Sequence, residues 1–264
     1  MATHFSKSPP DSELASSRAT LLSGRVNTPV TTKRVAIVQS NYIPWKGYFD
    51  LIDSVDEFIL LDTVQFTRRD WRNRNTIKTA QGLKWLTIPV VSKGKYHQRI
   101  CDTQIADSDW AQRHWQVIRS VYRSAPCFNV VGPAIEELYR TAPARFLSEV
   151  NRHFLDGLCR LLSITTALQN ACDFPASDEK SERLVDLCLQ TRATEYVSGP
   201  AARDYLETNL FTDRGVSVSW FQYDGYVEYP QQHPPFVHHV SVLDLLFQTG
   251  DSASCYIQRD GAGA

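Results

Sequence analysis

The sequence predicts an α/β fold, with a parallel-sheet, Rossmann-like core and a helical C-terminal half. Two short apolar runs, VAIVQS (35–40) and EFILLD (57–62), are typical of buried strands. The stretch between them, GYFDLIDSV (47–55), spaces its apolar residues as a short helix does. Strand, helix and strand in such close succession form a βαβ unit, which implies parallel strands and a right-handed crossover.

The rest of the chain predicts further strands and several helices. KWLTIPVV (84–91) is a third strand, and RICDTQI (99–105) is a candidate fourth. Apolar residues at helical spacing predict helices over 109–124, 132–140, 144–164, 182–190 and 241–250. Short strands are predicted at 194–199 and 215–223, with a helix from Pro200 between them. We expect a disordered leader over 1–32, one α/β domain over 33–250 (helical at about 108–192) and a flexible tail over 251–264.

Composition excludes several classes of protein. The chain has 264 residues and a formal net charge of -1, so its charge provides no global attraction to DNA or to an anionic membrane. No apolar run reaches membrane-spanning length, and the Ser/Thr/Pro-rich leader lacks the apolar core of a signal peptide. The six cysteines form no CxxC motif or Cys/His cluster, which predicts reduced thiols in a cytoplasmic protein.

The loop after the first predicted strand is rich in aromatic and amide side chains. Ligands of parallel sheets bind beyond the carboxyl ends of the strands, where this loop would lie. A glycine there lets the backbone approach a ligand, and rings can stack on a flat group. The alternative is that the rings only pack on the sheet. The candidate binding residues are Gln39, Asn41, Tyr42, Trp45, Gly47 and Tyr48.

The stretch after the second predicted strand, LLDTVQFTRRDWRNRNTIK (60–78), is strongly basic. Asp62 ends the strand and is expected to face the same crevice. Arginine forks bind phosphate or carboxylate through paired hydrogen bonds, so the stretch suits an anionic ligand or an RNA backbone. A solvated hairpin is the alternative. The candidates after Asp62 are Gln65, Arg68, Arg69, Trp71, Asn73, Arg74, Asn75 and Lys78.

Two later stretches add candidates. In YVSGPAARDYL (196–206) a strand ends and a helix begins, so Ser198, Gly199 and Arg203 could bind an anion, although an ordinary turn explains them too. In the proline-rich loop 226–239, His233 or His238 could act as a general base, with a loop-bracing role as the alternative. The histidine spacing matches no metal-ligand motif, and no metal is predicted.

In this order, these stretches resemble the WbqC-like family. The residues that carry the resemblance are VQSNYIPWKGYFDLI (38–52), DEFILLDTVQFTRRDWRNRNTIK (56–78), WLTIPV (85–90), YVSGPAARDYL (196–206), YPQ (229–231) and SVLDLLFQTG (241–250). The resemblance implies an enzyme of O-antigen or natural-product biosynthesis. It implies transfer of an aminoacyl group, such as glycyl, onto an amine such as an amino sugar.

IPWKGY (43–48) is also similar in placement to the His-x-Gly-His signature of nucleotidylyltransferases, with Trp45 and Tyr48 in place of the histidines. The leading hypothesis is an amide-forming transferase that uses ATP or an activated aminoacyl donor, including aminoacyl-tRNA, and a small-molecule amine acceptor. Asp62, Arg69, Asn73 and His233 are its predicted catalytic residues. The alternatives are a nucleotidylyltransferase-like enzyme and a non-catalytic binder of nucleotide-sugar or RNA.

Overall fold

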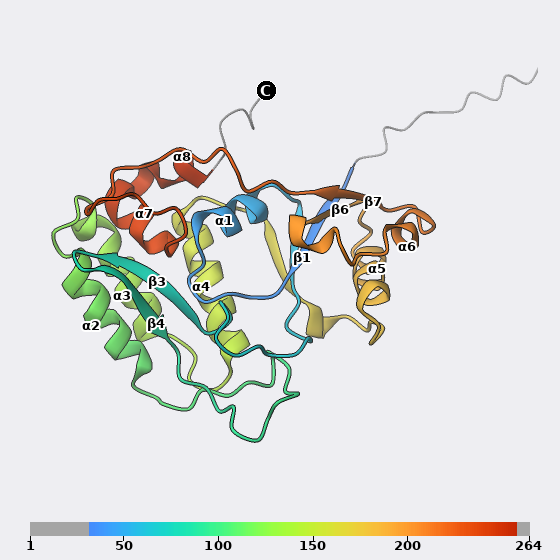
Figure 1. Ribbon diagram of the computed structural model, residues 1–264, viewed down its shortest axis with the longest axis horizontal. Coiled ribbons are helices and arrows are strands. Elements are labelled where there is room, and N and C mark those ends of the chain that lie inside the picture. The colour runs from blue at the N-terminus through green and yellow to red at the C-terminus, as the bar shows by residue number, and fades with distance from the viewer. Residues whose placement is uncertain (1–31, 258–264) are drawn as a thin grey trace, which may run out of the picture. The chain divides into compact units, whose positions relative to one another are not determined.

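A five-stranded, wholly parallel sheet forms the centre of the computed structural model, which describes residues 32–257 (Figure 1). The leader predicted over 1–32 therefore falls almost entirely outside the described residues. The strand order is β5-β2-β1-β6-β7. The strands are β1 (Arg34–Val38), β2 (Glu57–Leu60), β5 (Ala167–Asn170), β6 (Glu195–Ser198) and β7 (Ser217–Trp220).

The first βαβ unit confirms the sequence prediction. Helix α1 (Lys46–Asp53) connects β1 to β2, and the two strands pair in parallel with Val35 opposite Glu57. Strand β6 also pairs in parallel with β1, on the side opposite to β2. The chain therefore adds β2 and β5 on one side of β1, and then β6 and β7 on the other side. The α/β, Rossmann-like prediction is therefore correct, and loops at the carboxyl ends of these strands are the expected place for a ligand.

Helices cover both faces of the sheet (Figure 1). On one face, Ala36, Phe58 and Val197 pack with α1, α4 and the C-terminal helices in the larger core. On the other face, Val35, Ile59 and the residues around them pack with α5 and α6 in a smaller core. The helices are α2 (Trp110–Tyr122), α3 (Phe128–Arg140), α4 (Leu147–Leu161), α5 (Lys180–Gln190), α6 (Thr208–Thr212), α7 (Val242–Thr249) and α8 (Ser254–Ile257).

A long insertion separates β2 from β5. It begins with the antiparallel hairpin of β3 (Arg74–Thr79) and β4 (Gly82–Thr87), and α2, α3 and α4 follow. The strand predicted at 84–91 is therefore shifted to 82–87. The candidate strand at 99–105 is wrong, because this segment makes only isolated bridges, such as Gln65 with Arg99 and Val90 with Ile105.

The C-terminal end of the domain also differs from the prediction. Residues 251–257 were expected in a flexible tail, but they form the 3-10 turn η3 (Gly250–Ala253) and helix α8. Ala253 and Ile257 are buried in the larger core, which holds this end in place. In the described part of the chain, no helix has the length and apolarity needed to cross a membrane.

Candidate functional site

Asp62 lies just beyond β2, at the carboxyl edge of the sheet, and is almost completely buried. Its Oδ1 accepts a hydrogen bond from the backbone N–H of Ser40 at 2.9 Å. Burial raises the pKa of this carboxyl, while the hydrogen bonds from Ser40 and the charge of Arg72 oppose that rise. Among residues 32–257, no lysine, arginine or histidine forms an ion pair with Asp62. A buried carboxylate in this situation is poised to bind a cation or to exchange a proton.

Asp62 forms one wall of a cleft of about 460 Å³, which we call the acidic cleft. Its walls come from the carboxyl ends of β2 and β5, from the 3-10 turn η1 (Ala171–Asp173), from the insertion at Cys101 and from residues 148–156 of α4. The lining residues are Asp62, Cys101, Ser148, Glu149, Arg152, His153, Asp156, Asn170, Cys172 and Asp173. Four carboxyl groups face one arginine, so the lining is net negative.

The two basic side chains of the acidic cleft are held by protein groups. Arg152 Nε pairs with Asp156 at 2.8 Å, and its Nη2 donates to the Leu168 carbonyl at 2.9 Å. His153 Nε2 lies 2.8 Å from the Leu138 carbonyl. Since a carbonyl only accepts, this nitrogen bears the proton, and Nδ1 of the neutral ring has a lone pair. His153 is therefore a candidate base in the same cleft as Asp62.

The loop after β1 is fastened to residues 71–75; we call these contacts the loop latch. Asn75 Nδ2 donates to the carbonyls of Tyr42 at 3.2 Å and Ile43 at 2.9 Å. Tyr42 N–H donates to the Trp71 carbonyl at 3.1 Å. Ile43 has a φ of 38°, a left-handed conformation that β-branched residues rarely adopt. Asn75 thus stabilises a strained turn, and both of its donor bonds are to the chain itself.

Arg72 completes the loop latch. Its Nη1 donates to Asn41 Oδ1 at 2.6 Å and to the Gln39 carbonyl at 3.1 Å. Asn151 of α4 donates from Nδ2 to Ser40 Oγ at 2.8 Å and to the Arg72 carbonyl at 2.9 Å. Since Ser40 N–H also bonds Asp62, the latch fixes the backbone that holds the buried carboxylate.

The predicted ring-stacking residues of this loop contact protein. Tyr42 is fully buried, and its hydroxyl lies 2.6 Å from that of Tyr139. Tyr48 donates to the Gln39 carbonyl at 3.0 Å, and Trp45 lies against Tyr223 with ring centroids 5.6 Å apart. A Cβ on Gly47 would come within 2.4 Å of the Trp45 ring, so Gly47 makes room for that ring.

Arg68, Arg69, Asn73 and Arg74 come together around a second cavity of about 250 Å³, the basic pocket. Arg68 and Arg69 are exposed, and Arg69 has a φ of 60°. Arg74 lies over the Trp85 ring at 4.2 Å, and the Trp71 and Trp85 rings are 5.5 Å apart. Asn73 differs from its neighbours: it is buried and its Nδ2 donates to the Ile88 carbonyl at 2.7 Å.

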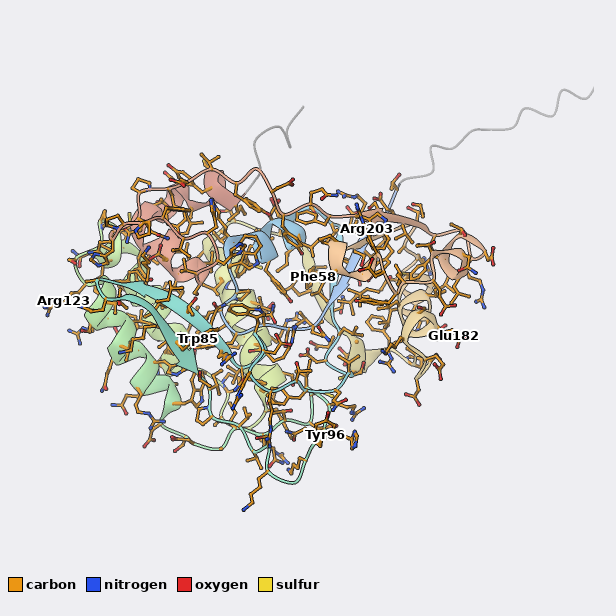
Figure 2. The ribbon with its side chains drawn as sticks, viewed as in Figure 1. Phe58, Trp85, Tyr96, Arg123, Glu182 and Arg203 are labelled. Carbon is orange, nitrogen blue, oxygen red and sulfur yellow. The ribbon has the colours of Figure 1, made fainter. Side chains whose placement is uncertain are left out.

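Gln65 belongs to a neighbouring hollow of about 220 Å³ that Arg68 also lines. Its Nε2 donates to the Tyr96 carbonyl at 2.8 Å. Figure 2 shows Trp85 on the hairpin and Tyr96 on the loop that follows it. Tyr96 is 77% exposed, so this rim of aromatic and basic side chains is open to a ligand.

Lys78 and the final motif form a buried polar clamp. Asp244 of α7 accepts hydrogen bonds from Tyr122 at 2.9 Å and from Tyr229 at 2.7 Å. Gln231 donates to the same carboxylate at 2.8 Å, and Lys78 donates to the Pro235 carbonyl. These contacts tie the proline-rich loop to the hairpin and to α2 and α7, which explains the YPQ and SVLDLL motifs structurally.

The remaining predicted residues lie apart from the acidic cleft. Ser198 Oγ donates to the Tyr196 hydroxyl at 3.3 Å, and Gly199 precedes the 3-10 turn η2 (Pro200–Ala202). Arg203 lies over the Trp220 ring at 5.5 Å. His233 and His238 belong to the proline-rich loop, which shares no residue with the lining of the acidic cleft.

Sequence reasoning missed most of the acidic cleft. Most of its side chains come from α4 and η1, and the sequence prediction for the helix over 144–164 rests only on its apolar stripe. The available signal was the polar side of that helix, where Glu149, Arg152, His153 and Asp156 follow at helical spacing. Among residues 32–257, no group of three or more His, Cys, Asp or Glu side chains is arranged to hold a metal ion.

A family model described as the WbqC-like protein family matches residues 39–256. The chain belongs to this family. A curated relative, "Uncharacterized protein Rv1507c" of Mycobacterium tuberculosis (strain ATCC 25618 / H37Rv), is 49% identical over 226 residues, which cover 86% of this chain and 98% of that protein. No solved structure matches the chain. Membership in the WbqC-like family is compatible with a biosynthetic enzyme, and the family resemblance of the sequence is confirmed.

Proposed function

We propose that this protein is an amide-forming transferase that moves an aminoacyl group, such as glycyl, onto a small-molecule amine such as an amino sugar. The observation that supports it is the buried Asp62 carboxylate in a net-negative cleft at the carboxyl edge of a parallel sheet. Parallel sheets bind ligands at that edge. An amine acceptor is cationic before it reacts, so it suits this lining.

Recognition of the amine follows from the charges of the acidic cleft. Asp62, Glu149 and Asp173 line it, and Arg152 is already paired with Asp156. An ammonium group would replace its hydration with these carboxylates, and a charge-assisted hydrogen bond is about twice as strong as a neutral one. An acetylated amine is neutral and would lose this attraction.

The donor is assigned to the basic pocket. Arg68 and Arg69 are exposed there and can meet a phosphate or carboxylate through paired donors. The backbone from Asp62 to Phe66 runs from the acidic cleft to the basic pocket. Four residue steps span at most about 14 Å, so Asp62 and Phe66 are no farther apart than that. A donor held by the arginines can therefore extend its acyl end toward an amine at Asp62.

The reaction needs a neutral amine at the acyl carbon. In the proposal, Asp62 binds the ammonium form and orients it, and His153 or Asp62 then takes one proton from it. The neutral nitrogen attacks the acyl carbon, and the tetrahedral carbon expels the donor's leaving group. The nitrogen gives its second proton to the leaving group or to water, and the amide remains. Positioning of the two substrates supplies most of the rate, because holding reactants together is worth several kcal/mol, about 7 to 11 in favourable cases.

Transfer from a defined donor tests the proposal. The purified full chain is incubated with glucosamine and either glycyl-tRNA or glycine plus ATP, and the glycyl amide is sought by mass spectrometry. Product with the first donor alone indicates an imported aminoacyl group. Product with glycine and ATP, together with ATP–pyrophosphate exchange, indicates that the protein makes its own adenylate. No amide from a panel of amino acids and amines contradicts the proposal.

Two matched variants strengthen the test. Asp62→Asn is expected to lower transfer at least about a hundredfold, since general acid–base groups contribute 10² or more. Asp102→Asn removes an exposed carboxylate that is paired with Arg99 and does not line the acidic cleft. Its transfer rate is expected to equal that of the wild type. Equal losses in both variants would show that the effect does not come from the cleft.

A further inference from the structure

Two cysteines from distant parts of the chain meet at the acidic cleft. Cys101 belongs to the insertion and Cys172 to η1, and both line this cavity. All six cysteines are free thiols. The other four are Cys127, Cys159, Cys188 and Cys255, and none of them lines the acidic cleft.

Strand pairing explains why these two cysteines meet. Leu60 of β2 is opposite Asn170 of β5, and Asp62 and Cys172 each follow two residues later. Neighbouring strands are about 4.8 Å apart, so the chain leaves the sheet with these two positions close together. Cys101 N–H donates to the Asp62 carbonyl at 2.9 Å, which places Cys101 beside the same strand end.

The two thiols differ in their surroundings. Both line the acidic cleft, but Cys172 is exposed while Cys101 is partly buried. Burial, with a smaller effect of Cys172, raises the pKa of the Cys101 thiol to about 12, so Cys101 is protonated near neutral pH. An accessible thiol next to a protected one is the arrangement of a reacting and a resolving cysteine.

We propose that Cys101 and Cys172 form a reversible disulfide at the acidic cleft when a peroxide oxidises Cys172, and that this bond narrows access to Asp62. The crosslink depends only on the placement of the two sulfurs. Its consequence for amine binding rests on the proposed function of the cleft.

The reaction has two balanced steps. The Cys172 thiolate attacks hydrogen peroxide, the O–O bond breaks, and sulfenic acid and hydroxide form, so that sulfur is oxidised and peroxide is reduced. The sulfur of Cys101 then attacks the sulfenic sulfur, the S–O bond breaks, and water leaves with the thiol proton. In sum, two thiols and one peroxide give one disulfide and two waters. Thiol–disulfide exchange with a reductant reverses the bond.

Peptide mapping tests the crosslink directly. The full chain is treated with hydrogen peroxide, its remaining thiols are alkylated, and it is cleaved with trypsin without reduction. Cys101 falls in the fragment 100–113 and Cys172 in the fragment 161–180, each with a single cysteine. The expected product is these two fragments joined, and dithiothreitol should separate them.

Three variants make the result specific. Cys255→Ser removes the other exposed cysteine and should leave the joined fragments unchanged. Cys101→Ser should abolish them and leave Cys172 as sulfenic or sulfinic acid, whereas Cys172→Ser should leave Cys101 reduced. Thermal melting of each reduced variant verifies folding. The disulfide proposal is overturned if peroxide oxidises the exposed Cys255 while Cys101 and Cys172 are both recovered as separate, alkylated thiols.

The effect on the cleft is measured separately. Glucosamine is titrated into the reduced and the peroxide-treated chain, with Cys101→Ser treated in the same way. Weaker binding only where the crosslink forms supports the proposed narrowing. A joined peptide with unchanged glucosamine binding would overturn the narrowing but not the crosslink. Absence of glucosamine binding in the reduced chain would contradict the proposed function instead.

Discussion

The loop latch and the acidic cleft both use polar residues at the carboxyl edge of the sheet, but they use them in opposite ways. In the latch, Asn75 and Arg72 direct their side-chain donors to the chain's own carbonyl and amide oxygens. In the cleft, Asp62 and its neighbouring carboxylates line a cavity of about 460 Å³. Polar residues in a motif can therefore serve the fold as well as a ligand.

This difference separates the predicted site residues into two groups. Tyr42, Asn73, Asn75 and Lys78 are buried and bonded to protein, so we assign them to the support of the site. Asp62 lines the cleft, and Arg68 and Arg69 line the basic pocket. The following predictions test this division, beginning with the largest expected effect.

Asp244→Ala should have the largest effect on stability. Three donors, on Tyr122, Tyr229 and Gln231, would lose their buried acceptor. Breaking such a buried polar network costs about 3 to 5 kcal/mol of unfolding free energy. Urea denaturation measures the change, and Asp251→Ala, at an exposed position of η3, is the control with little expected effect. A loss below about 1 kcal/mol would show that the clamp does not support the fold.

Lys46 predicts a pH dependence of stability. It is buried among aromatic rings, donates to the Val227 carbonyl at 2.6 Å, and burial lowers its pKa from 10.5 to about 8. The unfolded chain therefore binds this proton more tightly, and the unfolding free energy rises with pH between about 8 and 10.5. Across this pH window, the unfolding free energy of the wild type should rise by about 3 kcal/mol at most more than that of Lys46→Met. A constant difference between the two proteins across that window would contradict the lowered pKa.

Asn75→Ala tests the loop latch. The carbonyls of Tyr42 and Ile43 would lose their shared donor, and the strained turn at Ile43 would lose its support. Leaving buried polar groups unpaired costs about 1 to 3 kcal/mol. Asn209→Ala, at an exposed position of α6, is the matched control. If denaturation shows equal stability for both variants, the latch contributes nothing to the fold.

Arg69→Ala should change stability least. The side chain is exposed, and substitutions at exposed positions usually stay within about 0.5 kcal/mol. Binding of an anionic donor analogue, such as a glycyl adenylate mimic, should weaken by about tenfold with the loss of one charge-assisted contact. Unchanged binding together with a large loss of stability would move Arg69 into the supporting group.

The sequence predicts structure best where burial of apolar side chains alone determines the element. Strands β1 and β2 are apolar because helices cover both faces of the sheet, so the sequence predicts them from their continuous apolar residues. Strand β5 was missed because ALQN is short and half polar. The sequence predicts β3, RNTIKT, as part of a ligand-binding segment, because polar residues in an isolated sequence give no sign that their partners lie in the same chain.

The acidic cleft illustrates a second limit. Asp62 was predicted from its place at a strand end, and that rule depends only on local sequence. His153, Arg152 and Asp173 reach the same cavity through the packing of α4 and η1 against the sheet. This packing brings together residues about a hundred positions apart, which no local pattern encodes.

The most direct test of the account is the binding of an amine to the acidic cleft. Calorimetry compares glucosamine with N-acetylglucosamine on the wild type, on Asp62→Asn and on the control Asp102→Asn. The account predicts at least about tenfold tighter binding of glucosamine by the wild type and by Asp102→Asn, and no preference in Asp62→Asn. Equal affinities for both sugars in all three proteins would contradict the assignment of Asp62 as the amine-binding group.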